Sequence, residues 1–311
     1  MNHPLPADAE LPRYSAIDSA RIEADLDQLL AASRAAIETL LAEPGPATWE
    51  RLCAPLEELE DELERFWAPV SHLNSVSNAE PLREAYNACL PKLSAWRTWL
   101  GQHRALYEAF QAVAREDPSV DRVPGRRRAL DNALRDFTLA GVALEPAQRE
   151  RFGELSQRLA SLSARFSDNL LDATDAWSLT VGEERVAGLP ESTRAVARRN
   201  AGEAGEDGYR LTLDGPTYLA VMAHGKDREL REAVYTAWQT RASDQGPHAG
   251  TWDNSEVMHE ILDCRRELAS LLGFDNYAEL SLATKMAPDT ASVVTFLEDL
   301  AARARPVAEA E

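Results

Sequence analysis

The sequence has few of the residues that organise disulfide-rich, metal-binding and membrane-spanning proteins. Its 311 residues include only three cysteines, Cys53, Cys89 and Cys264, with no C-x-x-C pair among them. This odd number and wide spacing exclude a disulfide framework and a paired metal or redox motif, so we expect reduced, mostly buried thiols. No apolar run approaches the about 18 residues of a membrane span. The N-terminus lacks the basic and apolar regions of a signal peptide. These absences predict a soluble, cytoplasmic protein.

Basic residues are also in deficit. Lys and Arg number 33 against 52 Asp and Glu, which gives a formal charge of −19. The excess is spread evenly, with −9 over residues 1–150 and −10 over residues 151–311. Nucleic acids and anionic membrane surfaces both require a basic footprint. We therefore expect neither nucleic acid nor a membrane as a partner.

What the sequence does contain favours helices. Glycine is scarce, at 15 residues, while good helix formers dominate. Apolar residues at positions 152, 155, 159, 162, 166, 170 and 173 follow a helical period and predict one long amphipathic helix over residues 146–176. Alternating patterns at 177–181 and 209–213 predict two short, paired strands. The expected fold is mainly α: a multi-helix domain with long amphipathic helices and a small β-element near 177–213.

Capping residues, prolines and apolar spacing set the other expected elements. We expect a helix from about Asp18 to Glu43 and another beginning after Thr48. A loop is expected at 69–78, then one helix from about Pro81 to Ala114 with a kink at Pro91. Further helices are expected over these ranges: 190–201, 217–223, 227–241, 255–272 and 290–303. Pro306 suits the first turn of one more helix.

Three charged motifs offer chemistry, and each has a simpler interpretation. His259-Glu260 lacks the second His of a His-Glu-x-x-His zinc helix, since Asp263 stands there, so a surface pair is favoured. The acidic run 57–62 suits either a cation site or a solvated helix face, and the solvated face is favoured. The basic run 126–128 suits a phosphate, but an acidic chain disfavours it. No nucleophile elbow is present, and no Cys has an activating context.

Several segments nevertheless carry a specific resemblance. The segments that carry it are 66–76 (FWAPVSHLNSV), 82–94, 127–132, 169–174, 240–246, 252–255 and 281–287. In these segments the sequence resembles the thimet oligopeptidase family of zinc metallopeptidases. The matching segments follow the same order as in that family, and the resemblance extends from about residue 5 to the last residue. It implies a cytosolic enzyme that cleaves short, unfolded peptides within a deep channel of a mostly helical fold. Zinc in that family is held by a His-Glu-x-x-His helix and a later Glu.

The resemblance also sets expectations for what this chain lacks. The family's zinc motif lies C-terminal to every matched segment, so no catalytic or metal-binding residue can be assigned here. We expect zinc in the full-length enzyme and none bound by this chain. The partners would be short peptides and a missing C-terminal catalytic half. Candidate channel-lining residues, with core packing and loop capping as the alternative for each, are Trp67, His72, Asn74, Trp252 and Asn254.

Two hypotheses for the whole chain follow. In the first, residues 1–176 form an N-terminal helical region and residues 177–311 form the β-element with a truncated helical region. The chain is then the N-terminal wall of a zinc oligopeptidase and is inactive alone. In the second, it is a non-enzymatic helical interaction module. A large exposed apolar patch fits both hypotheses.

Overall fold

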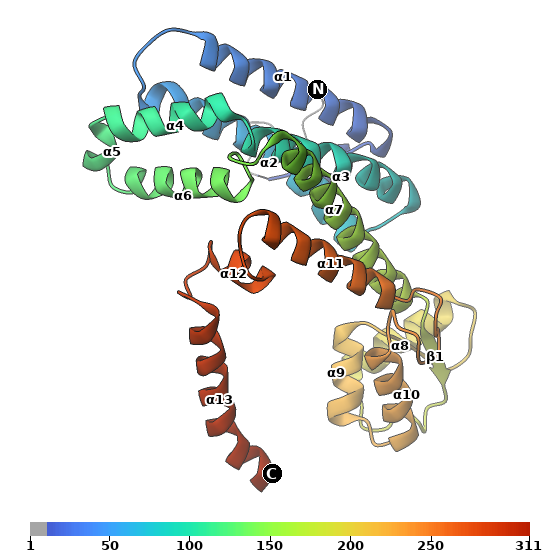
Figure 1. The fold of residues 1–311 in the computed structure, drawn as a ribbon. Coiled ribbons are helices and arrows are strands. Elements are labelled where there is room, and N and C mark those ends of the chain that lie inside the picture. Colours follow the sequence, from blue (N-terminus) through green and yellow to red (C-terminus); the bar gives the residue numbers. More distant parts are fainter. Residues whose placement is uncertain (1–10) are drawn as a thin grey trace. The chain divides into compact units, whose positions relative to one another are not determined.

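The computed structural model describes residues 11–311, and within them the chain is mainly α-helical, as the sequence predicts (Figure 1). Helices account for most residues, and two strands form the β-element. The elements are η1 (Tyr14–Ala16), α1 (Ser19–Ala42), α2 (Trp49–Val76), α3 (Glu80–Gly101), α4 (Arg104–Glu116), α5 (Ser119–Arg122), α6 (Arg126–Leu139), α7 (Pro146–Asp175), β1 (Ser178–Val181), α8 (Glu191–Glu203), β2 (Tyr209–Thr212), α9 (Gly215–His224), α10 (Arg228–Gln239), α11 (Ser255–Leu271), α12 (Tyr277–Leu282) and α13 (Thr290–Ala310).

The chain divides into two compact units. Unit 1 comprises Met1–Ser161 and Cys264–Glu311, and unit 2 comprises Leu162–Asp263. Both boundaries fall inside a long helix, the first in α7 and the second in α11. The long helix predicted over 146–176 is confirmed as α7. The division of the sequence into regions 1–176 and 177–311 stays a prediction.

Unit 1 is held by two apolar clusters. In the first, Ile22, Leu26 and Leu29 of α1 pack with α2 and α3. In the second, the N-terminal half of α2 packs with α3, α4 and α6 around Leu106 and Leu130, which are almost fully buried. Each cluster follows from apolar residues three or four positions apart, which fall on one helix face.

Helix α2 corrects one expectation of the sequence analysis. The loop expected at 69–78 is wrong, because α2 continues through Pro55 and Pro69 to Val76. A proline inside a helix removes one backbone hydrogen bond. Burial offsets that loss here, since Phe66, Pro69 and Val70 all lie in the interior of unit 1.

The single helix expected over 81–114 is also wrong at its centre. The chain ends α3 at Gly101 and starts α4 at Arg104. His103 makes the new start, because its Nδ1 accepts a hydrogen bond from the backbone N–H of Leu106 at 3.2 Å. Pro91 lies within α3, which continues past it.

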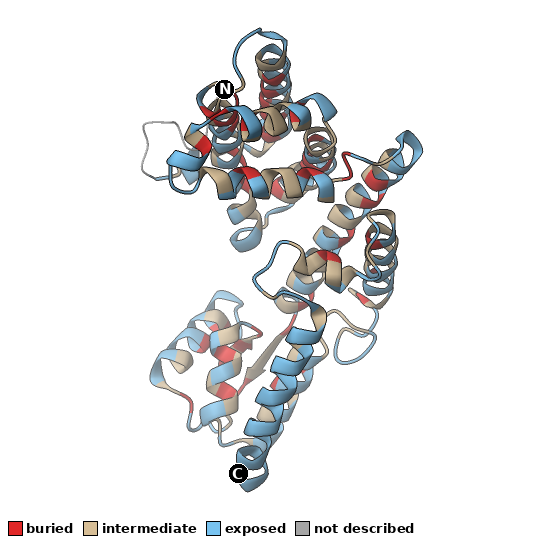
Figure 2. Cartoon of the chain, turned by 60° about the vertical axis from the view of Figure 1, so that its left-hand side comes forward, coloured by how far each residue is buried: buried red, intermediate tan, exposed pale blue. Residues whose placement is uncertain are grey.

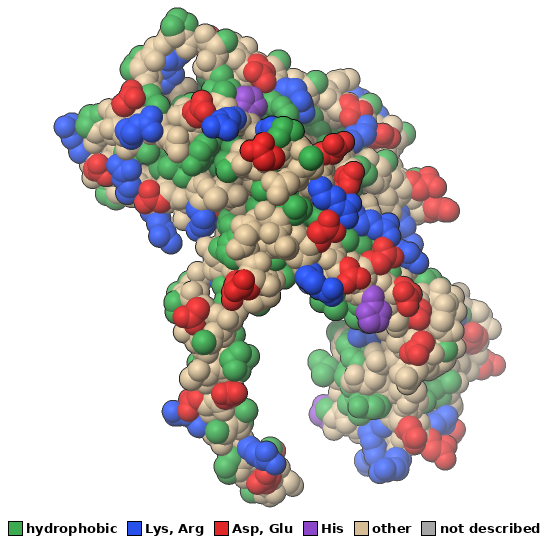
Figure 3. Space-filling view, viewed as in Figure 1, with side chains coloured by type: hydrophobic (Ala, Val, Ile, Leu, Met, Phe, Trp, Pro, Cys, Tyr) green, Lys and Arg blue, Asp and Glu red, His purple; other side chains and the backbone are tan. Residues whose placement is uncertain are grey.

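Helix α13 differs from expectation in length. It continues through Pro306 to Ala310, so the separate helix expected at Pro306 is not formed. None of its residues is buried (Figure 2). Phe296, Leu297 and Leu300, which share the apolar face, are 62%, 55% and 46% exposed. Figure 3 shows hydrophobic side chains at the surface of this helix.

Unit 2 contains the β-element. Strands β1 and β2 pair antiparallel, with Leu179 opposite Leu211, which confirms the predicted pairing. Helices α8, α9 and α10 supply the rest of an apolar cluster that includes Val221 and Leu230, both fully buried. Asp227 starts α10 by accepting hydrogen bonds from two backbone N–H groups and pairs with Arg185.

A buried carboxylate joins two helix starts in unit 1. The Asp117 side chain accepts a hydrogen bond from the backbone N–H of Trp49 at 2.8 Å and another from that of Ser119 at 2.8 Å. Asp117 thus accepts a hydrogen bond from a free backbone N–H in the first turn of α2, although it lies 68 positions away in the sequence. The N-cap residue Thr48 makes no such bond with its own side chain. The bond from Trp49, followed by that from Ser119, holds the pKa of Asp117 below its usual value.

We predict that Asp117→Asn lowers Tm at neutral pH by about 2–4 °C, because the amide loses one of the two acceptor oxygens. Because the pKa of Asp117 is lower in the folded protein than in the unfolded chain, its carboxylate stabilises the fold above the unfolded pKa of about 3.9. This stabilisation is lost as the pH falls through the lower folded pKa. The difference in Tm from wild type should therefore shrink below about pH 4. Thermal unfolding across pH tests this, with the exposed Asp131→Asn as the control. An equal difference at pH 3 and pH 7 would contradict it.

Candidate functional site

Three of the candidate channel residues lie on α2 in unit 1. Trp67 is buried and stacks on Tyr86, with 5.0 Å between ring centroids. It lines a cavity of about 420 Å³ with Arg97 of α3 and Phe152 of α7. Trp67 therefore contributes both to the packing of α2 against α3 and to the lining of this cavity.

His72 and Asn74 lie further along the same helix. His72 is exposed, and its ring lies 5.5 Å from that of Tyr14. The backbone and side-chain oxygens of Asn74 both accept hydrogen bonds from the Asn78 amide, at 3.0 and 2.8 Å. His72 is thus available at the surface, while Asn74 helps to end α2.

Trp252 and Asn254 lie in one loop of unit 2, between α10 and α11. Asn254 is 2% exposed, and its amide is engaged on both sides. Its oxygen accepts a hydrogen bond from Asn169 at 2.8 Å, and its nitrogen donates to the carbonyl of Phe166 at 3.0 Å. Trp252 is half-buried and meets His248 edge-on at 5.4 Å.

The loop that carries these two residues has an unusual backbone. Ala242 has φ of 48°, in the left-handed region that non-glycine residues seldom adopt. The backbone N–H of Asn254 donates to the Ala242 carbonyl at 3.0 Å and thereby closes the loop. Gly246 also has a positive φ, and a Cβ there would collide with Thr240. These two positive φ angles and the bond between Asn254 and Ala242 define the backbone path of the loop.

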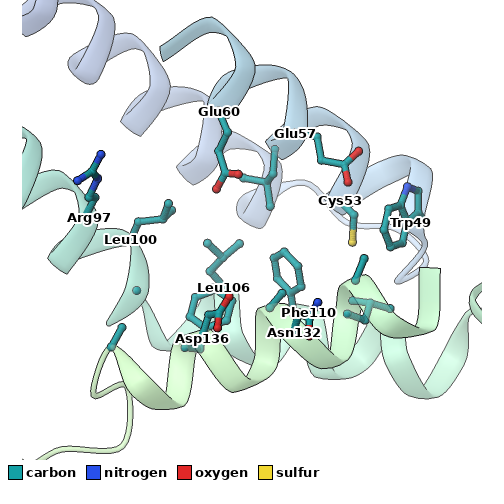
Figure 4. A pocket seen from close by; sticks show the side chains of 17 residues that line it. Trp49, Cys53, Glu57, Glu60, Arg97, Leu100, Leu106, Phe110, Asn132 and Asp136 are labelled. Carbon is teal, nitrogen blue, oxygen red and sulfur yellow. The ribbon is translucent and has the colours of Figure 1, made fainter. Parts of the chain in front are cut away.

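A second cavity in unit 1, of about 440 Å³, was missed by sequence reasoning (Figure 4). Helices α2, α3, α4 and α6 surround it. The acidic run 57–62 was the one signal that could have found it, because Glu57 and Glu60 lie on its α2 side. Asp136 and Asn132 face them from α6.

Cys53 and Cys89 do not offer nucleophiles. Burial, then the nearby charge of Glu57, raises the pKa of Cys53 to about 12. Burial and Glu23 raise the pKa of Cys89 to about 11. Both thiols stay protonated near neutral pH, and the thiolate is the reactive form.

The potential metal ligands of the described residues are not grouped into a metal site. Within residues 11–311, no group of three or more His, Cys, Asp or Glu side chains is arranged to hold a metal ion. His259 and Asp263 lie exposed on α11. No described site therefore fits the zinc that the family resemblance implies. No helix in the described part of the chain is long and apolar enough to span a membrane.

The basic run at the start of α6 is engaged in ion pairs. Arg126 contacts Glu50 at 2.7 Å, and Arg127 contacts Asp121 at 2.8 Å. Arg126 also lies over the Trp49 ring at 5.0 Å. These contacts tie α6 to α2 and α5, so two of the three arginines have structural partners in place of a phosphate.

Two family models match the chain. Residues 26–149 match the N-terminal domain of neurolysin and thimet oligopeptidase, and residues 221–311 match peptidase family M3. The two matched ranges together show that the chain is similar to peptidase family M3 enzymes over most of its length.

Within that family the chain is similar to oligopeptidase A. It is 48% identical over its whole length to that protein from Salmonella typhimurium and from Escherichia coli, and it covers 46% of each. It is 36% identical over 92% of its length to the probable cytosolic oligopeptidase A of Arabidopsis thaliana, of which it covers 41%. The chain thus spans about half the length of the curated relatives it matches.

We predict that Asn254→Ala destabilises the protein by about 1–3 kcal/mol, because the Asn169 amide and the Phe166 carbonyl lose a buried partner. Gln239→Ala, at an exposed amide of the same unit, should change stability by less than about 0.5 kcal/mol. Urea unfolding of both variants measures the difference. Equal stabilities would show that the buried network does not hold the loop.

Proposed function

We propose that this chain forms one wall of a peptide-binding channel in a zinc oligopeptidase that hydrolyses short, unfolded peptides. The metal and the catalytic base would come from a catalytic part that residues 11–311 do not contain. The observation that carries the proposal is the 48% identity to oligopeptidase A along the entire chain.

One feature of the structure supports this role. Helix α13 presents an apolar face on which Phe296, Leu297 and Leu300 are all exposed, and an exposed apolar patch can mark a surface that another part of a protein packs against. The catalytic part is the occupant we propose for that face.

The same proposal assigns the candidate residues and the location. His72 and Trp252 are the candidates with exposed or half-exposed rings, and aromatic rings can stack on peptide side chains. Trp67 would contribute through the cavity it lines. We place the enzyme in the cytosol, by analogy with the probable cytosolic oligopeptidase A of Arabidopsis thaliana.

We predict that the purified chain, with zinc added, does not cleave an internally quenched fluorogenic oligopeptide. Mixing it with the portion of Salmonella oligopeptidase A that the alignment does not cover should restore cleavage that a chelator abolishes. The initial rate of fluorescence increase is the measurement. Chelator-sensitive cleavage by the chain alone would contradict the proposal. Failure of the mixture to form a complex would favour the interaction-module hypothesis.

We further predict that Phe296→Glu combined with Leu300→Glu reduces the restored rate at least about tenfold, because a charge in a packed apolar interface is costly. The fold of the chain should not change, since both residues are exposed. Val196→Glu with Leu219→Glu, two exposed apolar residues of unit 2, serves as the matched control. Equal rates for both double variants would remove α13 from the interface.

A further inference from the structure

The cavity between α2 and α6 combines an apolar floor with charged walls. Its volume of about 440 Å³ lies in the range of small-molecule sites. Its apolar and aromatic surface comes from Leu56, Leu106, Phe110, Leu130 and Phe137. Trp49 and Arg97 mark its two ends in Figure 4.

The charge at this cavity is predominantly negative. Three carboxylates line it, those of Glu57, Glu60 and Asp136, against the single guanidinium of Arg97. Asp136 is already paired with Arg135 at 2.8 Å. Glu57 and Glu60 have no ion-pair partner anywhere in residues 11–311, and Figure 4 shows the Glu60 side chain extending from α2 toward α6.

These two carboxylates influence one another. Shielding from water by neighbouring protein atoms, and then the charge of Glu57, raise the pKa of Glu60 above its usual value. Like charges beside an apolar surface are unfavourable when nothing neutralises them. A cation placed between them would relieve the repulsion and gain an attraction to both.

We propose that this cavity binds a small organic amine, whose protonated ammonium lies between Glu57 and Glu60 and whose apolar body contacts Phe110, Leu130 and Phe137. Charge complementarity selects the ammonium, and the apolar floor selects a carbon body over a bare metal ion. An aromatic body also gains from the faces of Trp49 and Phe110. The site lies wholly within unit 1 and does not depend on the peptidase role proposed for the chain.

The structure argues against three other occupants. An anion would face three carboxylates with one compensating Arg97. A divalent metal would need a third donor in range, and the described residues contain no cluster of three. A neutral apolar molecule would gain from the floor alone and would not sense the carboxylates.

Binding of three probes to the full chain tests the proposal. The probes share one aromatic body: 2-phenylethylamine as the cation, 2-phenylethanol as the neutral analogue and 3-phenylpropionate as the anion. We expect the amine to bind about tenfold more tightly than the alcohol in calorimetry at low salt, and the anion not to bind. Spectral shifts of Trp49 in NMR should report the site.

Variants then separate charge from folding. Glu57→Gln with Glu60→Gln should remove the preference for the amine and leave the affinity for the alcohol unchanged. Glu58→Gln with Glu64→Gln, exposed carboxylates of the same helix that do not line the cavity, should keep the preference. Equal Tm values would show that all three proteins are folded. No binding of any probe, or a preference that survives the change at Glu57 and Glu60, would overturn the proposal.

Discussion

Burial of the apolar face of helix α2 is the constraint on which unit 1 depends. Its N-terminal half supplies Trp49, Leu52 and Leu56 to one apolar cluster, and its C-terminal half supplies Phe66 and Val70 to the other. The helix can serve both clusters only if it continues unbroken through Pro69. The same helix lines both cavities of the unit, with Glu57 and Glu60 at one and Trp67 at the other.

The spacing of apolar residues predicted most helices and strands, because an element that buries one face carries apolar residues at a regular interval along its sequence. Helix α7 and the strand pair β1–β2 were found in this way. The prediction was wrong at Pro69 and at Pro306, where a break was expected and the helix continues. The energetic cost of a proline inside a helix can be estimated from the sequence, but the tertiary contacts that offset this cost cannot. The helix start at Arg104 was missed, since a His cap is rarer than the Ser, Thr, Asp and Asn caps that sequence analysis seeks.

The candidate site was harder to predict than the fold. Asn254 stands out in the sequence as part of a matched segment, but only the structure shows its amide bonded to Asn169 and Phe166. The cavity beside Glu60 was not predicted, because it depends on how α2 and α6 are spaced, and the acidic run 57–62 was the only sequence signal near it. A run of carboxylates reads the same in sequence whether it faces water or a hollow.

We propose that this chain supplies a channel wall and that the catalytic zinc is held elsewhere, and the metal content after dialysis against zinc distinguishes this from a zinc site in the chain itself. We expect less than about 0.1 zinc per molecule of the chain alone, and about one per complex with the complementary part of a relative. One zinc retained per molecule of the chain alone would contradict it.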